Sequence, residues 1–257
     1  MGLARDDTWI PELWSLFSVG AVILFSRVGL RCWFSGFRDP AADDIVSLLI
    51  PVFYTICAAS SHLVYVNGNK VDFTQAEINS LTEEEASRLV LGTKWELPSS
   101  YSYITVLWLL KASLLLLYWR LTRKLERDRL LVVFTAVICA LTYIGVILTI
   151  SLACIPFWKY WRIRPLPSNE CIRPPEIFIA LAIANILTDT GIIALPIILL
   201  ARLHISRKKK LKVLCFLSSG TIVTIAAIVR ISITLSKPTQ LNWNRWATLT
   251  LIALSDV

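Results

Sequence analysis

Six stretches of about 20 mostly apolar residues run through this 257-residue chain, and they constrain its fold more than any other feature. A helix of that length can cross the hydrocarbon core of a bilayer, which is about 30 Å thick. Charged residues make up only 17% of the chain, too few to cover the surface of a soluble domain of this size. We therefore expect an all-α membrane protein. Its spanning helices are predicted at residues 13–31, 44–66, 101–122, 130–155, 177–203 and 211–236.

A seventh apolar stretch begins near Trp246 and reaches Val257, the last residue. As a helix, residues 246–257 would rise only about 18 Å, which is too short to span a bilayer. The expected architecture is a seven-transmembrane-helix bundle, one domain over residues 1–257, with the seventh helix truncated. No small-residue cleavage site follows the first apolar stretch, so that helix is expected to remain as a signal anchor.

Basic residues are distributed unequally between the two sides of the expected bundle. The loops after the first, third and fifth helices contain 14 lysines and arginines, and the segments on the opposite side contain 10. The positive-inside rule makes the first set cytoplasmic and places the N-terminus outside. The net charge of +8 is then explained by topology and by contact with lipid headgroups, including the run at residues 207–210. We expect a multi-pass protein of the plasma membrane or an endomembrane, in contact with the lipid bilayer and with no nucleic-acid partner.

The long outer loop, residues 67–100, contains two capping-box patterns, Thr74 to Glu77 and Thr82 to Glu85. They predict one or two short helices over the outer mouth of the bundle, with Gly92 as a helix stop. Two interpretations remain open for this segment, a solvated acidic loop and a lid over a ligand. The tryptophans near the outer boundary similarly fit an interfacial belt or a recognition pocket.

Two of the six cysteines, Cys154 and Cys171, fall on the outer side of the bundle. That compartment is oxidising, so they are expected to form a disulfide. Closing a loop of this size would contribute roughly 3 kcal/mol in the chain-entropy model. The cysteines and histidines have no zinc-ligand spacing, and no metal is expected.

Five ionisable residues are predicted within the bundle, where burial of a charge in lipid costs several kcal/mol. Lys111 and Asp189 lie near the middle of the third and fifth helices, and Arg230 lies in the outer half of the sixth. Asp256 would lie in the seventh helix, and His62 near the outer end of the second. These residues are the candidates for a ligand pocket that opens outward. The alternative, compatible with the first, is that the charges pair to fix helix packing.

The order of motifs along the chain resembles that of the fungal rhodopsin-domain family of integral membrane proteins. The resemblance rests on an acidic pair, an outer histidine, a Lys-x-Ser…Tyr-x-Arg signature, a Cys-x-Pro…Trp…Cys pattern, an Asp…Leu-Pro pattern and a later Leu…Lys…Phe…Gly…Arg series. The matching residues are Asp43, Asp44, His62, Lys111, Ser113, Tyr118, Arg120, Cys154, Pro156, Trp158 or Trp161, Cys171, Asp189, Leu195, Pro196, Leu203, Lys208 or Lys210, Phe216, Gly220 and Arg230.

The chain departs from the family pattern in three places. Ala42 stands where a tryptophan usually precedes the acidic pair, and residues 58–61 replace small glycines before the histidine. The glutamate of the family's seventh helix would fall at or just beyond Val257.

The family includes receptor-like pathogenicity proteins and membrane proteins encoded in toxin gene clusters such as the satratoxin cluster. The resemblance therefore implies a rhodopsin-like domain and a receptor-like sensor of a small extracellular ligand in a fungus. Arg120, at the cytoplasmic end of the third helix, is the candidate switch toward a signalling partner. No Asp/Glu-Arg-Tyr triplet is present, so the residues do not indicate coupling to a G protein.

The alternative function is an integral membrane enzyme of secondary metabolism, a cyclase-like protein that protonates a lipophilic substrate. Its acid would be Asp189 or Asp256, but an acid beside Lys111 or Arg230 would be held ionised and is a poor proton donor. Retinal is not expected either, because Lys111 is the mid-membrane lysine and lies on the third helix rather than the seventh. We therefore expect no cofactor and favour the receptor-like function.

Overall fold

The computed structural model describes residues 9–35, 42–70, 73–122, 126–165, 171 and 175–202. Five long helices account for most of these residues: α1 (Trp9–Ser35), α2 (Ala42–Asn67), α4 (Glu83–Leu121), α5 (Glu126–Leu152) and α7 (Pro175–Arg202). Each of the five is long and apolar enough to cross a membrane, and these ranges contain no strand. The all-helical prediction is confirmed. The helices expected at 211–236 and 246–257, and with them the seven-helix count, lie outside the described residues.

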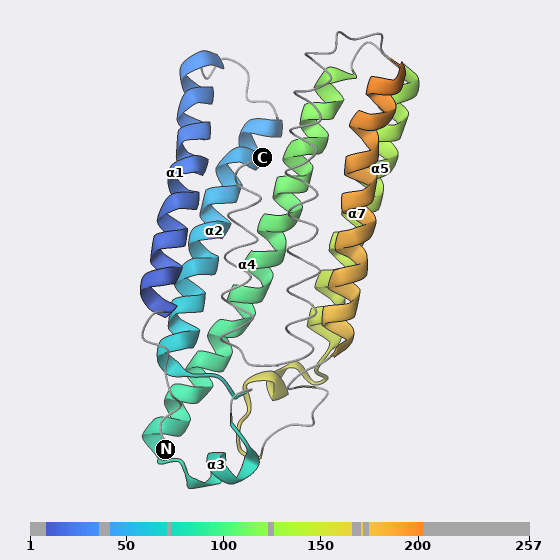
Figure 1. Cartoon of the computed structure of the whole chain (residues 1–257). Helices are drawn as coiled ribbons and strands as arrows, with labels where there is room; N and C mark the ends of the chain where they lie inside the picture. Colours follow the sequence, from blue (N-terminus) through green and yellow to red (C-terminus); the bar gives the residue numbers. More distant parts are fainter. Residues whose placement is uncertain are drawn as a thin grey trace.

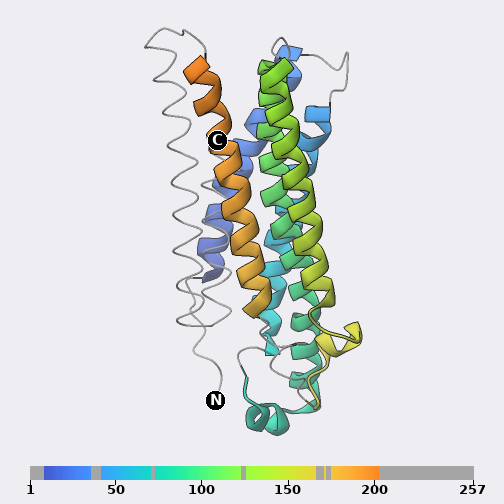
Figure 2. The same ribbon diagram turned by 90° about the vertical axis from the view of Figure 1, so that its right-hand side faces the viewer.

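The long helices run up and down side by side (Figure 1). In chain order α1 packs on α2 and α2 on α4, while α5 packs against both α4 and α7. Figure 2 shows that two short helices, α3 (Gln75–Ser80) and η3 (Phe157–Trp161), lie at one end of the bundle, which we call the cap end. The opposite end, where α1, α4 and α7 finish, is called the basic end, after the lysines and arginines in its loops.

Large apolar side chains point outward from the long helices as well as inward. Val22, Phe134, Leu141 and Ile183 are each more than half exposed. Large exposed apolar surfaces are rare on soluble proteins, because contact with water makes them unfavourable. Surrounded by acyl chains, the same side chains incur no such cost. The apolar outer surface of the bundle therefore agrees with the membrane environment predicted from the apolar stretches.

Stacked aromatic rings hold α1 against α2. The rings of Trp9 and Tyr65 stack with their centroids 4.4 Å apart, and Phe17 stacks on Tyr54 at 5.1 Å. Gly20 makes the second contact possible, because a Cβ at this position would lie 2.5 Å from the Tyr54 hydroxyl oxygen. Offset aromatic pairs of this kind contribute roughly 0.5–1.5 kcal/mol beyond the burial of their area.

The two capping boxes predicted from the sequence are both formed. The Thr74 side chain accepts a hydrogen bond from the backbone N–H of Glu77, and the Glu77 carboxylate accepts from Thr74 in return. These hydrogen bonds lower the pKa of Glu77. The pair Thr82 and Glu85 repeats the arrangement at the start of α4.

The helix stop predicted at Gly92 is wrong, because α4 continues through Gly92 and Pro98 without interruption. Its 39 residues span about 58 Å, nearly twice the hydrocarbon core, so α4 projects well beyond the membrane at the cap end. The absence of a side chain at Gly92 instead lets α4 pack closely against the turn at Gly68. A Cβ at this position would lie 1.9 Å from the carbonyl oxygen of Gly68, whose φ of 83° turns the chain at the end of α2.

The cap end has a small core of its own. Ile78, Ala86, Leu89 and Ile163 are buried together, from α3, from the start of α4 and from the segment after η3. The disulfide between Cys154 and Cys171, predicted from their outer positions, joins the end of α5 to the segment before α7.

Arg164 ties the segment after η3 to α3 and to the start of α4. Its guanidinium donates to the backbone carbonyls of Ile78 and Leu81 and forms an ion pair with Glu83 at 2.7 Å. These contacts hold the Cys154–Cys171 segment over α3 and the start of α4, so the cap is one packed unit.

Lys70 is buried beneath this cap and is only 1% exposed. Its ammonium donates to the carbonyl oxygens of Tyr160 and Cys171 and lies 4.4 Å from the centroid of the Tyr160 ring. Burial lowers the pKa of Lys70 to about 8, although the nearby Glu96 carboxylate opposes that shift. Burial and the same carboxylate raise the pKa of Tyr160.

A methyl group at Gly92 should separate α4 from the turn at Gly68. We expect Gly92→Ala to lower the free energy of unfolding by about 1–3 kcal/mol, because the displaced atom is backbone and cannot rotate away. The melting temperature in detergent measures the loss. Gly145→Ala is the matched control, since nothing lies within 4 Å of its Cβ position and alanine is the better helix former. Equal melting temperatures for the two variants would contradict the close approach.

Lys70 should make the stability of the cap depend on pH. Between pH 8 and the ordinary lysine pKa near 10.5, the unfolded chain holds a proton that the folded protein has released. The folded state therefore gains stability as the pH rises through this window. From pH 7 to pH 9.5 the gain is about 2 kcal/mol, measured as the stability of wild type minus that of Lys70→Met. A stability difference that stays constant or falls over this range would show that burial does not lower the pKa of Lys70.

Candidate functional site

Lys111 lies on α4 and extends its side chain toward α7, where its ammonium contacts three side chains. Its Nζ is 2.9 Å from Oδ1 of Asp189 and 2.6 Å from both Asn185 Oδ1 and Thr188 Oγ1. The side chain of Lys111 is 4% exposed and that of Asp189 is 14% exposed. An ammonium has three N–H donors, so the three acceptors of α7 can satisfy all of them.

The acceptors occupy one face of α7 because residues i, i+3 and i+4 of a helix lie above one another. Asn185, Thr188 and Asp189 have this spacing within an otherwise apolar helix. Their own hydrogen bonds fix the arrangement. The Asn185 amide donates to Asp189 Oδ2 at 3.1 Å, and the Thr188 hydroxyl donates to the Ala184 carbonyl at 2.8 Å. The hydroxyl proton of Thr188 is thus engaged, and its oxygen remains an acceptor for Lys111.

The aromatic ring of Trp108 also lies beside the ammonium. Lys111 Nζ lies 4.9 Å from the centroid of this ring, a cation–π distance. The Trp108 indole nitrogen itself donates to the carbonyl oxygen of Cys139 on α5, at 2.9 Å. The site therefore ties α4 to α7 through charge and hydrogen bonds, and α4 to α5 through the indole that lies beside the charge.

A buried ion pair of this kind has two chemical consequences. Removing either partner strands the other charge in a medium that cannot solvate it, which typically costs 3–5 kcal/mol. Replacing one partner by another group of the same charge or hydrogen-bonding type costs much less. The pair is therefore a contact that a suitably charged molecule could exchange, as well as one that holds two helices together.

The other pocket candidates do not join this cluster in the described residues. His62 Nδ1 accepts a hydrogen bond from the Trp14 indole at 3.3 Å, between α2 and α1. Ser61 and Ser99 share a hydrogen bond at 2.9 Å, which places His62 level with Ser99 on α4. Lys111 is 12 residues further along α4, about 18 Å away. Arg230 and Asp256 lie outside the described residues.

Arg120, the switch candidate, is exposed in the last turn of α4 at the basic end. Its switch role stays a prediction.

Two residues of the site were missed by sequence reasoning, Asn185 and Thr188. Their spacing to Asp189 was the signal that could have found them, because three polar side chains share one face of an apolar helix. The buried lysine at the cap, Lys70, had no comparable signal in the sequence.

Comparison with known proteins gives one family. A model of the fungal rhodopsin domain matches residues 26–255, which is nearly the whole chain. Searches of curated proteins and of solved structures gave no match. The matched range includes α2, α4, α5, α7 and the Lys111–Asp189 pair. The chain belongs to the fungal rhodopsin-domain family of membrane proteins.

Proposed function

We propose that this protein is a receptor-like sensor of a small extracellular ligand, built on a seven-helix bundle. The observation that carries the proposal is the contact of Lys111 with Asp189, Asn185 and Thr188, which joins two membrane helices through buried charge. A ligand shifts an equilibrium between two helix packings only if it binds one of them better. A small molecule that supplies an acceptor to Lys111, or a donor to Asp189, would favour the packing in which the pair is separated.

The orientation proposed for the sensor places the cap end outside the cell or in the lumen. The disulfide between Cys154 and Cys171 lies at this end, and disulfides persist in oxidising compartments. The basic residues gather at the opposite end, as cytoplasmic loops do. The N-terminal residue of α1, Trp9, packs on Tyr65 of α2 at the cap end, which supports an outer N-terminus.

The proposed output lies at the basic end. Arg120 is exposed there in the last turn of α4, nine residues beyond Lys111 on the same helix. A change in the packing of α4 against α7 would move Arg120 relative to the cytoplasmic ends of the other helices. A signalling partner that binds this end could read that movement.

An enzyme that protonates a lipophilic substrate is less well supported by the geometry. Such an acid needs an apolar cavity in front of it to hold the substrate. Asp189 instead has one carboxylate oxygen on Lys111 and the other on the Asn185 amide.

Ligand binding at the pair is tested by the thermal stability of the purified protein in the presence of a panel of small molecules. We expect some compound to raise the melting temperature of wild type but not of Lys111→Met or Asp189→Asn. Both variants should melt earlier than wild type without ligand, because each strands a buried charge at a cost of about 3–5 kcal/mol.

Thr190→Val is the matched control, since this exposed hydroxyl, within the part of the chain that the structure describes, bonds the Ile186 carbonyl one turn earlier in α7. It should respond to the compound as wild type does. If no compound shifts wild type while both charge variants melt earlier, the pair serves packing alone and the sensor proposal fails at this site. Chemical conversion of the stabilising compound would favour the enzyme.

The orientation is tested by labelling with a membrane-impermeant thiol reagent in intact cells. In a Cys32→Ser/Cys215→Ser background, a cysteine introduced at the exposed Asn79 should be labelled at once. A cysteine at Lys209 should react only after the membrane is permeabilised. The reverse pattern would place the N-terminus in the cytoplasm. An extracellular ligand could then not enter the bundle from the cap end.

A further inference from the structure

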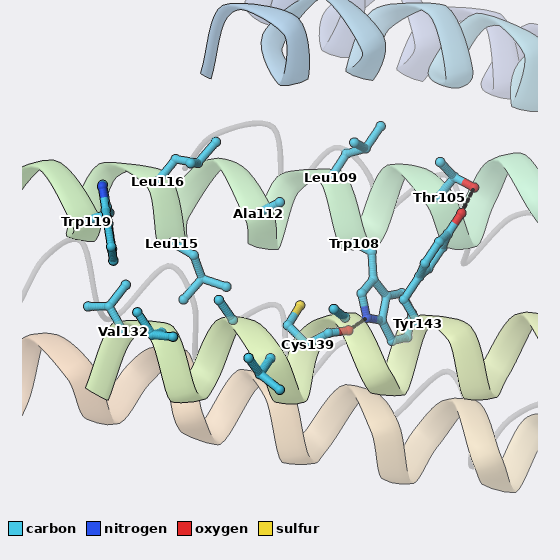
Figure 3. A pocket seen from close by; sticks show the side chains of 14 residues that line it. Thr105, Trp108, Leu109, Ala112, Leu115, Leu116, Trp119, Val132, Cys139 and Tyr143 are labelled. Atoms are coloured by element: carbon cyan, nitrogen blue, oxygen red, sulfur yellow. Dashed lines mark hydrogen bonds between the residues drawn. The ribbon is translucent and has the colours of Figure 1, made fainter. Parts of the chain in front are cut away.

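A hollow between α4 and α5 runs along the outside of the bundle and borders the Lys111 site through Trp108. Its volume is about 530 Å³, and the described residues that line it come from these two helices. Figure 3 shows Trp108 and Leu115 of α4 directed toward α5 and Leu109 and Leu116 pointing away from it, with Trp119 at one end of the lining and Thr105 and Tyr143 at the other. The central part is widened by small residues, Ala112 on α4 and Ala136 and Ala140 on α5.

The chemistry of the lining selects an apolar occupant. At the end near Thr105, the polar side chains are already engaged with one another or with the backbone. The Thr105 and Tyr143 hydroxyls share a hydrogen bond at 3.1 Å, and the Trp108 indole donates to the Cys139 carbonyl. The rest of the lining is aliphatic or aromatic. A polar ligand would lose its hydration here without finding partners, whereas a hydrocarbon chain would lose nothing.

The end of the hollow at Trp119 has a different character, because the cationic side chain of Arg129 lies there. The guanidinium of Arg129, on α5, lies 4.0 Å from the centroid of the Trp119 ring on α4. A stacked guanidinium keeps its N–H donors in the plane of the group, directed away from the ring and suited to phosphate oxygens. Residues 119–130 contain five basic and two acidic side chains, so this end is cationic as a whole.

The length of the hollow agrees with a lipid of one leaflet. From Trp119 to Thr105 the helix rises by 14 residues, about 21 Å, which exceeds the roughly 15 Å of half a hydrocarbon core. An acyl chain entering from the basic end could thus contact the lining along its whole length. The basic end is the one that the distribution of charge assigns to the cytoplasm, where anionic lipids are concentrated.

We propose that this hollow is a binding site for an anionic phospholipid, with one acyl chain between α4 and α5 and the phosphate at Arg129. The apolar lining takes the chain and the guanidinium stacked on Trp119 takes the headgroup. Trp108 is shared with the Lys111 site, since its ring lies 4.9 Å from Lys111 Nζ, but the side chains proposed to bind the headgroup and those changed to fill the hollow contact neither Lys111 nor Asp189 in the described part of the chain.

The test uses native mass spectrometry of the full chain, released from mixed micelles that contain equal amounts of phosphatidylserine and phosphatidylcholine. Wild type should retain one phosphatidylserine at least fivefold more often than phosphatidylcholine. Arg129→Gln should bring the two lipids to within about twofold of each other, because only the headgroup contact is lost. Ala136→Leu and Ala112→Leu, which fill the hollow, should lower retention of both lipids at least fivefold.

Two control variants keep the result specific to the hollow. Ala59→Leu adds the same side chain at an exposed position of α2, and Arg88→Gln removes an exposed arginine at the cap end. Both should retain lipid as wild type does. Equal retention of the two lipids by wild type would overturn the proposal without any variant. Unchanged lipid retention in Arg129→Gln and Ala136→Leu would also overturn it. A wild-type dimer that Ala136→Leu dissociates would overturn it as well, because the hollow would then be an interface between copies of the chain.

Discussion

The structure depends on one constraint, that a charge placed among membrane helices must find its partner within the protein. Lys111 meets it by contacting three side chains of α7, and Asp189 meets it by contacting Lys111 and Asn185. Because a stranded charge costs several kcal/mol, the pair fixes which faces of α4 and α7 meet. The exposed apolar residues have no such preference, since lipid and neighbouring helices are equally apolar. Charge, rather than hydrophobicity, therefore specifies how these helices are oriented about their axes.

Much of the fold could be predicted from the sequence because the bilayer permits few solutions. The apolar stretches located α1, α2, α5 and α7, and the capping boxes at Thr74 and Thr82 marked helix starts correctly. The continuation of α4 from Glu83 to Leu121 was missed for a physical reason. Gly92 and Pro98 are helix breakers by local preference, but tertiary contact decides here. Gly92 permits the approach of Gly68, and that packing outweighs the propensity of a single residue.

The candidate site was predictable only in part. An isolated lysine and an isolated aspartate at membrane depth indicate a pair, since each needs the other. Helical spacing alone could have added Asn185 and Thr188. The position of His62 beside Trp14 could not be derived, because it depends on how α1 and α2 rotate against each other. Lys70 was equally hidden. Its burial follows from the cap, and the cap follows from contacts of Tyr160 in η3 with Lys70, 90 residues earlier, and of Arg164 with Ile78, 86 residues earlier.

The two sites on α4 face different neighbours, and this arrangement links them mechanically. Lys111 and Ala112 are adjacent in sequence but about 100° apart around the helix, so one meets α7 while the other lines the hollow against α5. Since α5 packs on both α4 and α7 and Trp108 lies between Lys111 and α5, we expect a change in the spacing of one pair of helices to alter the other. A lipid that holds α4 and α5 at the spacing compatible with the intact ion pair would oppose its separation. By reciprocity, a ligand that separates the pair would weaken lipid binding by the same factor.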